Sequence, residues 1–311
     1  MPSLREELGK VLAELGREYK DVTVITGDLG KSTGASAFEA FPERYFNLGI
    51  SEQDMMGTAA GLASAGKIPI VNTYAVFLSG RAWEQIRNTV GRDRLNVKMV
   101  ATHAGISPCA DGSSHQCFED IAIMRCIPGL TLVLPADVSE MKHAMRAAVE
   151  TAGPFYIRLP RGEIPRIFHD EDGFQIGRAR RMSDGGDVAI VAAGFLIPEA
   201  VKAEALLRKD GIRATLLDMH TIKPADTQTI VEVARQTGGI VTAEDHNILG
   251  GLGSTVAEIV CRDSPVPVEM IGIRDRFGES GELRELMEIY GLTARHIYNA
   301  AKRVMKLKER S

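Results

Sequence analysis

Hydrophobic positions along the chain follow two periods, one typical of helices and one typical of buried strands. Continuous apolar runs such as VTVIT at 22–26 and DVAIVAA at 187–193 predict strands that are covered on both faces. Amphipathic stretches with apolar residues three or four positions apart separate these runs and predict helices. Because strands and helices alternate, we expect an α/β fold with mostly parallel sheets, arranged as two three-layer α/β domains.

The predicted elements fall into two groups, separated by a polar, turn-rich stretch from 160 to 186 that lacks either period. In the first group we expect helices at 3–19, 52–65, 77–91, 119–125 and 137–150, and strands at 22–26, 44–48, 69–72, 97–102, 131–134 and 155–159. In the second group we expect strands at 187–193, 212–218, 239–243 and 266–271, and helices at 196–209, after the glycines at 250–253, at 281–290 and at 293–308. We therefore assign residues 1–165 to a first domain, 166–186 to a linker and 187–311 to a second domain.

Composition and charge exclude several function classes. The 311 residues carry 37 basic and 41 acidic side chains, a net charge of −4, which does not favour nucleic acid or an anionic membrane as a partner. No apolar run approaches the ~20 residues of a membrane-spanning helix, and the N-terminal MPSLREELGKVLAEL lacks the apolar core of a signal peptide. Four cysteines without C-x-x-C spacing are typical of reduced thiols, so we expect a cytoplasmic protein.

The stretch FNLGISEQDMMGTAAGLASAG at 46–66 is the most informative part of the chain. Ser51 and Asp54 have capping-box spacing, so a helix is expected to begin here. The next twelve residues carry no charge and are mostly small, which predicts a helix that is buried on all sides. Glu52 would lie at its mouth, where desolvation raises the pKa of a carboxyl and the helix N-terminus lowers it. Such a carboxylate can exchange a proton with a ligand, although an ordinary first-turn acid has the same signature.

The loop THAGISPCADGSSHQ begins where a predicted strand ends, and ligands bind at such ends in open parallel sheets. It contains His103, Asp111 and His115. His can move protons near pH 7, and Asp can orient a hydroxyl or an imidazole. Three such side chains within one short loop favour a functional site. Zinc binding by the two histidines with Cys109 and Cys117 is an alternative, but the spacing is irregular and no paired motif supports it.

Two further strand ends supply candidates in the first domain. Tyr74 and Phe77 follow a predicted strand; they are core residues by default, but a flat heteroaromatic ligand could stack on one of them. The segment GDLGKSTG at 27–34 lacks the spacing of a phosphate loop, so nucleotide hydrolysis is a weak interpretation. Its Gly, Lys and Ser residues still suit an anionic substrate group.

Arginines and glycines elsewhere are ambiguous by sequence alone. Arg158 and Arg161, in YIRLPRGE, suit phosphate or carboxylate, although one of them could make only a domain-interface salt bridge. GGLGST at 250–255 lacks the full dinucleotide-binding pattern and a following acid, so NAD is not expected. These glycines more simply allow a tight strand-to-helix turn.

Taken together, these segments resemble the thiamine-diphosphate enzymes of the transketolase family. The motifs occur in the family's order and span essentially the whole chain: NLGISEQDMMGTAAGLA, TYAVFLSGRAWEQIRN, THAGISPCADGSSHQCFEDIA, YIRLPRGEIP, AEDHNILGGLGSTVAE and DRFGESG. They match only the latter half of a full-length transketolase, namely its pyrimidine-binding domain and its C-terminal domain. The G-D-G…N motif, with which the family binds Mg²⁺ and the cofactor diphosphate, is not found.

The resemblance therefore implies the C-terminal subunit of a split transketolase. Its cofactors would be thiamine diphosphate and Mg²⁺, with the metal bound by a separate N-terminal subunit that carries the pyrophosphate-binding domain, and the implied assembly is α₂β₂. The implied reaction is the transfer of a two-carbon ketol unit from a ketose phosphate to an aldose phosphate.

The resemblance also implies roles for individual residues. Glu52 matches the glutamate that hydrogen-bonds the aminopyrimidine ring of the cofactor, and the other cofactor-binding matches are Asp28, Leu29, Tyr74 and Phe77, of which Phe77 stacks on the ring. The matches to substrate-binding groups are His103, Asp111 and His115 for the donor sugar, and Ser32 and Arg161 for the acceptor phosphate. We expect Glu52, His103 and His115 to be catalytic, and we expect no metal ligand in this chain.

Departures from the family pattern leave two rivals. Gly80 stands where many full-length transketolases have a further aromatic residue. Deoxyxylulose-phosphate synthases, which condense pyruvate with an aldehyde phosphate, have a similar loop but typically carry Arg in place of His103, so a subunit of such an enzyme is the first rival. The second rival is a non-catalytic assembly subunit, although a merely structural chain has no physical need for the acids and histidines above.

Overall fold

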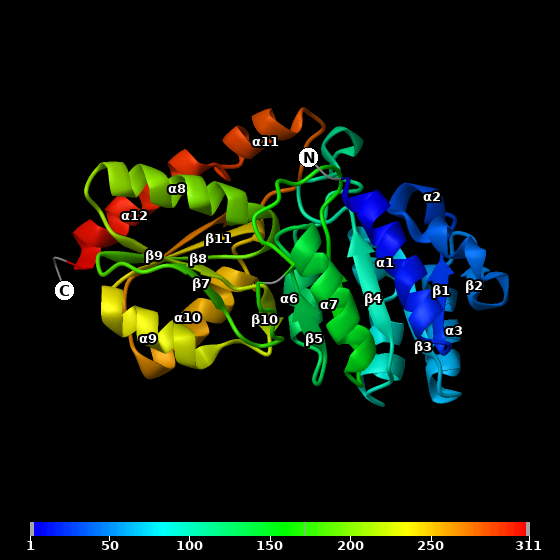
Figure 1. The fold of residues 1–311 in the computed structure, drawn as a ribbon. Coiled ribbons are helices and arrows are strands. Elements are labelled where there is room, and N and C mark those ends of the chain that lie inside the picture. The colour runs from blue at the N-terminus through cyan, green and yellow to red at the C-terminus, as the bar shows by residue number, and fades with distance from the viewer. Residues whose placement is uncertain (1–2, 171, 309–311) are drawn as a thin grey trace.

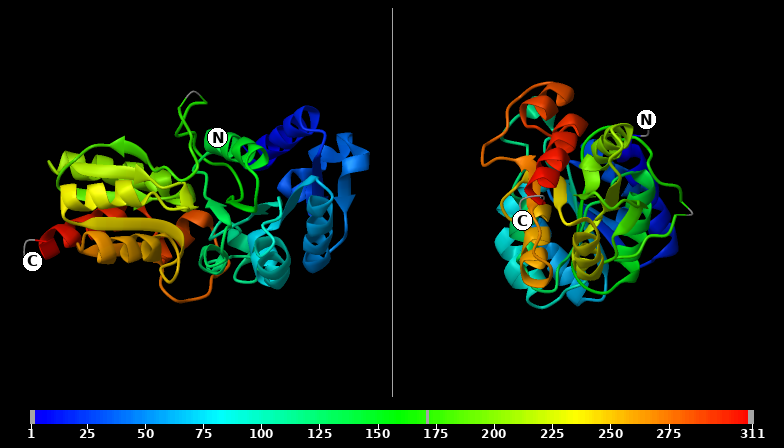
Figure 2. Two further views of the ribbon diagram at one scale, coloured as in Figure 1. Left: turned by 90° about the horizontal axis from the view of Figure 1, so that it is seen from below. Right: turned by 90° about the vertical axis from the view of Figure 1, so that its left-hand side faces the viewer.

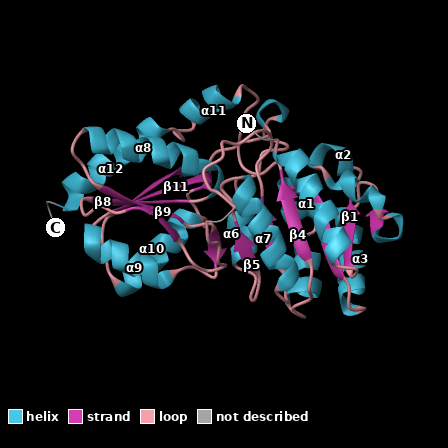
Figure 3. Cartoon of the chain, in the orientation of Figure 1, coloured by secondary structure: helices cyan, strands magenta, loops and turns pink. Residues whose placement is uncertain are grey.

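The computed structural model describes residues 3–170 and 172–308, and these ranges build two domains that lie side by side (Figure 1). In each domain helices cover both faces of a mostly parallel sheet (Figure 3), so the expected fold class is confirmed. The C-terminus lies at the far end of the second domain, whereas the first helix begins near the junction between the domains (Figure 2).

The first sheet has seven strands in the order β10-β5-β6-β4-β3-β1-β2. Six of them come from the first half of the chain and run parallel: β1 (Val22–Thr26), β2 (Tyr45–Asn47), β3 (Ile68–Tyr74), β4 (Lys98–Thr102), β5 (Thr131–Val133) and β6 (Phe155–Arg158). The seventh, β10 (Thr221–Lys223), comes from the second half and pairs antiparallel with β5. The second half of the chain therefore completes the sheet of the first domain.

Helices cover the first sheet on both faces. One face carries α1 (Leu4–Glu18) and α7 (Val138–Glu150), and the other carries α3 (Glu52–Ser64), α4 (Ala75–Arg81) and α6 (Asp120–Arg125). The short elements are α2 (Gly30–Thr33), η1 (Ala35–Ala40), η2 (Pro42–Arg44), α5 (Trp83–Gln85), η3 (Ile86–Gly91) and η4 (Cys109–Asp111). The helix predicted at 77–91 is interrupted once: α4 ends at Arg81, because Ala82 has φ −97° and ψ 10°, and helical structure resumes in α5 and continues through η3 to Gly91.

The second sheet has five strands in the order β12-β11-β8-β9-β7. Four are parallel, β8 (Val188–Ala192), β9 (Ala214–Asp218), β11 (Ile240–Asn247) and β12 (Val268–Ile273), and β7 (Arg180–Ser183) pairs antiparallel with β9. One face carries α8 (Ile197–Lys209), α11 (Leu283–Ile289) and α12 (Ala294–Lys308), and the other carries α9 (Thr227–Thr237) and α10 (Leu252–Asp263) (Figure 1). The turn η5 (Gly194–Leu196) precedes α8.

Apart from the short helical turns, two strands and one helix were not predicted from the sequence. Strands β7 and β10 are short edge strands with basic residues, and β7 lies inside the range that we assigned to the linker. Helix α9 begins after Asp226, whose side chain caps it by accepting a hydrogen bond from the backbone N–H of Thr229. Both strands are only three or four residues long, too short to show a clear alternation of apolar and polar residues.

One apolar cluster runs through both domains. It joins Leu132 and Tyr156 of the first sheet to Leu217, Met219 and Ile222 of the second half of the chain, and all five side chains are buried. The two domains are therefore fixed to each other by packing as well as by strand β10. Among the described residues, no helix has the length and apolar character required to cross a lipid bilayer.

Candidate active site

The predicted functional residues gather at the carboxyl ends of the parallel strands of the first sheet. Asp28 and Leu29 follow β1, and Glu52 follows the turn after β2. His103 follows β4, and Arg161 follows β6. Because these strands are neighbours and all run in one direction, their ends meet at one edge of the sheet.

Glu52 is buried at the first turn of α3, and its carboxylate is held by an arginine. The helix begins at Glu52 as predicted, with Ser51 as the N-cap, but the Ser51 hydroxyl donates to the Leu48 carbonyl at 2.9 Å instead of capping the helix. The Arg81 guanidinium donates to both oxygens of Glu52, at 3.1 and 3.2 Å. Glu52 is 3% exposed, whereas Arg81 is 51% exposed. The Glu52 carboxylate is therefore separated from solvent by the side chain of Arg81, which is itself half exposed.

The same arginine lies over an aromatic ring. The Arg81 guanidinium carbon is 4.3 Å from the centre of the Phe77 ring. A planar cation thus connects Glu52 and Phe77 by a charge-assisted hydrogen bond at one edge and by a cation–π contact on its face. The two residues that the sequence predicted for one ligand ring lie within reach of one flat group.

Tyr74, Phe77 and the two predicted histidines form an aromatic cluster. The Tyr74 ring stacks on His103 with 3.8 Å between ring centres and on Phe77 with 5.7 Å. The His115 ring meets Phe77 edge-on at 5.3 Å. Burial lowers the pKa of His103 to about 4, with a smaller contribution from the charge of Arg161. His103 is therefore neutral at pH 7, where it can donate or accept a hydrogen bond.

A cavity of about 260 Å³ opens beside this cluster. Its walls include Tyr74, His103, Ser32 and two arginines, Arg5 and Arg161. Arg161 also donates to the Asp111 carboxylate at 2.8 Å, which places the third predicted loop residue at the same cavity rim. Two arginines that line one cavity suit a phosphate group.

Arg5 was not predicted from the sequence. It lies in the first turn of α1, and nothing in its surroundings, SLREEL, separates it from an ordinary helix residue. The packing of α1 on the 30–34 turn places it at the cavity, because Gly34 leaves no room for a Cβ against the Arg5 carbonyl. That glycine, which has φ +92°, and Gly9 of α1, where a Cβ would lie 3.0 Å from the Gly34 carbonyl oxygen, are the local signals of this close approach.

Asp28 and Leu29 lie next to the turn that precedes Glu52. The Asn47 side-chain oxygen accepts hydrogen bonds from the backbone N–H of Asp28 at 2.9 Å and of Gly49 at 3.1 Å. Asp28 has φ +60°, so this turn holds it in a conformation that few residues adopt. The structure therefore brings both residues to the Glu52 end of the site.

Arg158 does not belong to the site. Its guanidinium is buried and donates to Asp120 at 2.9 Å and to Asp245 at 2.7 Å, which joins the first domain to the second. Burial alone would lower the pKa of Arg158, but the two carboxylates raise it above its ordinary value. The domain-interface alternative is thus correct for Arg158, and only Arg161 lies at the cavity.

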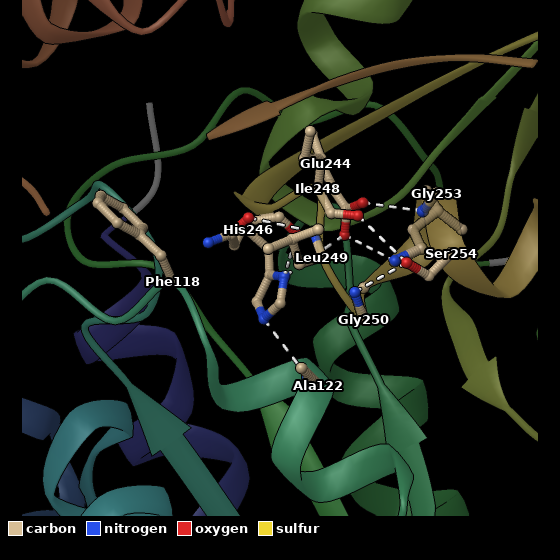
Figure 4. Close-up of polar contacts among 12 residues, drawn as sticks. Phe118, Ala122, Glu244, His246, Ile248, Leu249, Gly250, Gly253 and Ser254 are labelled. Atoms are coloured by element: carbon tan, nitrogen blue, oxygen red, sulfur yellow. Dashed lines mark hydrogen bonds and ion pairs between the residues drawn. The ribbon is translucent and has the colours of Figure 1, made fainter. Parts of the chain in front are cut away.

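The glycine-rich turn GGLGST surrounds a buried carboxylate of its own chain (Figure 4). Glu244 accepts hydrogen bonds from the backbone N–H of Leu252 at 2.7 Å and of Gly253 at 2.8 Å, at the start of α10. Burial raises the pKa of Glu244 to about 7. A side chain on Gly251 would overlap the Glu244 carboxylate. The amides that would bind a dinucleotide phosphate are therefore already used.

The zinc alternative finds no support in the described parts of the chain. No three His, Cys, Asp or Glu side chains within residues 3–170 and 172–308 are grouped as metal ligands would be. The Cys117 thiol is buried against the Ser79 hydroxyl at 3.7 Å, and the Cys109 thiol contacts the Ser107 carbonyl at 3.0 Å. The two cysteines thus make local contacts that differ from each other.

Comparisons with known proteins agree with this arrangement. The family model for the transketolase pyrimidine-binding domain matches residues 1–166, and the model for the transketolase C-terminal domain matches residues 177–297. The chain is 44% identical over 307 residues to a putative transketolase C-terminal section of Methanocaldococcus jannaschii, covering 97% of this chain and 95% of that protein. It is 38% identical over 306 residues to a 6-deoxy-6-sulfo-D-fructose transketolase subunit of Clostridium sp. (strain MSTE9), covering 98% and 95% of the two chains.

A solved structure is similar over its full length. It is described as a split gene transketolase in the form of an inactive β4 tetramer, and it matches with a TM-score of 0.93 and 46% identity. The match covers 99% of this chain and 100% of that chain. With both domains matched in order and the site at the expected strand ends, the chain belongs to the transketolase family.

Proposed function

We propose that the chain is the C-terminal subunit of a split transketolase that depends on thiamine diphosphate. The subunit holds the aminopyrimidine half of the cofactor, and an N-terminal partner subunit holds the diphosphate and Mg²⁺. Together they transfer a two-carbon ketol unit between sugar phosphates. The observation that carries the proposal is the buried Glu52 carboxylate, placed beside Phe77 at the end of the parallel strands.

The contacts of Arg81 indicate whether a flat group such as the cofactor ring fits between these residues. Its flat guanidinium donates to Glu52 and lies on the face of Phe77. An aminopyrimidine ring needs the same two partners, a carboxylate at its edge and an aromatic face. The residues therefore fit the ring, and Arg81 must turn away when the ring binds.

In this proposal, each site residue of the chain has its own role in binding or proton transfer. The bound cofactor supplies the nucleophilic carbon that carries the ketol unit. Glu52 hydrogen-bonds a ring nitrogen and holds the shared proton there, in a site where water is largely excluded. Neutral His103, together with His115, offers hydrogen bonds to the hydroxyl and carbonyl groups of the donor sugar. Asp111 accepts a hydrogen bond from a hydroxyl group of the sugar and so orients that hydroxyl.

We assign the sugar phosphate to the cavity between α1 and β6. Arg5, Ser32 and Arg161 reach it from three elements. Arg161 now binds Asp111 at 2.8 Å in an exposed ion pair, which exchanges readily because such pairs contribute little. A phosphate can therefore draw Arg161 toward Arg5.

Removing either arginine is expected to weaken sugar-phosphate binding selectively. We predict that Arg5→Met and Arg161→Met each raise KM for an aldose phosphate acceptor about 10- to 100-fold, because one charge-assisted hydrogen bond contributes about 1.5–3 kcal/mol. KM for glycolaldehyde, which has no phosphate, should change less than about threefold. Steady-state kinetics of the reconstituted complex measures both.

A surface arginine provides the matched control. Arg262 is 68% exposed and pairs with Asp263 far from the cavity, so Arg262→Met should leave both KM values unchanged. If Arg5→Met and Arg161→Met raised the two KM values equally, the cavity would not be a phosphate site.

The surface next to Glu52 suits a partner subunit. The sequence predicted that α3 is buried on all sides, but in this chain one side of the helix is exposed. A Cβ added to Gly57 or Gly61 would meet no atom within 4 Å, and the neighbouring Ile50 is 75% exposed. Beyond Asp54, this side of the helix carries small uncharged residues that allow another backbone to approach closely, so we place the N-terminal subunit here and propose an α₂β₂ assembly.

The isolated chain is expected to be inactive. With thiamine diphosphate and Mg²⁺ it should transfer no ketol unit from xylulose 5-phosphate above background, because the diphosphate-binding residues are on the other subunit. Adding the N-terminal subunit should restore activity. Robust turnover by this chain alone would contradict the two-subunit proposal, whereas no turnover by the complex would contradict the reaction.

The substrate class separates the proposal from its rivals. Pyruvate as the preferred donor in the reconstituted complex would favour a synthase of the deoxyxylulose-phosphate type, and a complex whose activity survives loss of Glu52 would favour an assembly subunit. A relative is named as a transketolase subunit for 6-deoxy-6-sulfo-D-fructose, so a panel of ketoses should include specialised sugars. We also propose a cytoplasmic location, since all four cysteines are free thiols.

A further inference from the structure

The loop that carries Asp111 and His115 is closed at its base. Gly105 and Cys117 exchange backbone hydrogen bonds at 3.1 and 3.2 Å. A side chain on Gly105 would overlap the carboxylate of Asp245, which comes from β11 of the second domain. The base of the loop therefore rests on the second domain.

The tip of the loop is tied to the second domain through Gln116. This side chain is 4% exposed, and its amide nitrogen donates to the Glu279 carbonyl at 3.0 Å and contacts the Cys109 carbonyl at 3.5 Å. One amide thus connects both ends of the 109–116 turn to residue 279. The backbone N–H groups of Gln116 and His115 both donate to the Gly112 carbonyl at 3.0 Å, so fixing Gln116 also fixes the backbone of His115.

Two glycines allow this close approach. A Cβ on Gly278 would overlap the Gln116 side-chain oxygen, and a Cβ on Gly112 would lie 2.5 Å from the Ser280 hydroxyl. The Gln116 oxygen has no hydrogen-bond partner among the described residues, so it is held in place by the Gly278 backbone. At both contacts, therefore, a glycine of one segment makes room for a side chain of the other.

The segment 275–282, which we call the bracing segment, is itself anchored. The Tyr290 hydroxyl donates to the Phe277 carbonyl at 3.0 Å and lies 3.3 Å from a Glu279 oxygen. Arg276 lies 3.9 Å from the Tyr290 ring centre and donates to the Ile289 carbonyl at 2.7 Å. These contacts connect the bracing segment to α11, away from the active site.

We propose that the bracing segment positions the sugar-binding loop, with Gln116 as the positioning residue. The second domain would thereby set the affinity for the donor sugar without touching the sugar or the cofactor. The identity of the ligand rests on the function proposed above, but the positioning of the loop by Gln116 concerns only contacts within this chain. Asp111 and His115 contact the ligand correctly only while the amide of Gln116 stays bound to residue 279.

Two variants disrupt the contact between Gln116 and the bracing segment, one on each side of it. Gln116→Leu keeps the volume of the side chain but removes both donated hydrogen bonds. Gly278→Ala leaves every polar group in place and pushes the Gln116 amide away. Gly186→Ala, also in the second domain, is the matched control, because a Cβ at Gly186 would meet no atom within 4 Å.

Hydrogen exchange of the full chain tests the positioning directly. We expect amides of residues 109–116 to exchange about tenfold faster in Gln116→Leu and Gly278→Ala, while amides of β8 and β11 keep their wild-type rates. Unchanged exchange in the loop would overturn the inference. Faster exchange throughout both domains would also overturn it, since the residues would then be merely structural.

Kinetics of the reconstituted complex tests the consequence. In both variants KM for xylulose 5-phosphate should rise about tenfold, while kcat and the Kd of thiamine diphosphate should change less than about twofold. An unchanged donor KM, or an equal rise in the cofactor Kd, would overturn the inference. Failure of the proposed function would instead appear as absence of ketol transfer in the wild-type complex, and the exchange experiment would still decide the positioning.

Discussion

Replacing Glu52 with Gln should reduce kcat of the reconstituted complex about 10²- to 10⁴-fold, the usual contribution of a positioned acid or base. The amide has the shape of the carboxyl and can still hydrogen-bond a ring, but it cannot hold and return a proton. Steady-state turnover of a ketose phosphate donor measures the loss. Circular dichroism and assembly with the partner subunit should remain as in the wild type, because the variant removes no packing atoms.

The same helix offers a matched control. Asp54 is also in the first turn of α3 but is exposed. Asp54→Asn removes an equal charge from the same helix N-terminus without affecting the buried acid. Because Asp54 lies on the side of α3 that we assign to the N-terminal subunit, kcat is measured at saturating partner subunit, where it should stay within about twofold of the wild type. If Glu52→Gln kept more than half of the wild-type kcat, the assignment of Glu52 to the cofactor ring would have to be abandoned.

Replacing Arg158 with Met should lower the free energy of unfolding by about 3–5 kcal/mol, because it leaves buried carboxylates without their cation. The side chains of Arg158, Asp120 and Asp245 are 3%, 0% and 1% exposed, so water cannot replace the lost partner. The Tyr156 hydroxyl, which donates to Asp120 at 2.9 Å, satisfies only part of that carboxylate. Urea unfolding followed by circular dichroism measures the change.

Neutralising the carboxylates should repair part of this loss. In the triple variant Arg158→Met, Asp120→Asn, Asp245→Asn, the two carboxylates that Arg158 paired with are neutral, and stability should recover by more than half. Arg262→Met, at an exposed ion pair, should change the free energy of unfolding by less than about 0.5 kcal/mol. A loss below about 1 kcal/mol for Arg158→Met would mean that the junction is hydrated or held mainly by the apolar cluster.

The start of α3 shows what a local sequence pattern can predict. The helix begins at Glu52 because Ser51 leaves the helical region, with φ −151°, and because the following residues favour a helix. The pattern did not predict which side of the helix is covered. Small, uncharged residues suit a buried helix, but Gly57 and Gly61 lie on a side where no described residue would come within 4 Å of an added Cβ. The small, uncharged residues of α3 predict that its surface is packed against other atoms, but they do not predict whether those atoms belong to this chain or to another.

Arg5, Arg158 and Arg161 show the limit of sequence interpretation for charged residues. Arg158 and Arg161 are three positions apart at one strand end, yet one lies at a buried junction and the other at the cavity. Arg5 has no sequence signal of its own, but α1 brings it to the same cavity. The role of a charged side chain depends on which other elements surround it, and that depends on contacts distant in sequence.

The amino-acid sequence by itself determined the alternation of strands and helices and the place of the site at the carboxyl ends of strands. Both follow from interactions between residues close in the chain and from the common direction of parallel strands, whereas most residues of the candidate site were predicted from the resemblance of the motifs to the transketolase family. Tertiary structure alone decided that β10 joins the first sheet, that Arg5 enters the cavity, and that Gln116 is held by residue 279. These are contacts across the junction of packed elements, where shape and burial select partners that no local pattern specifies.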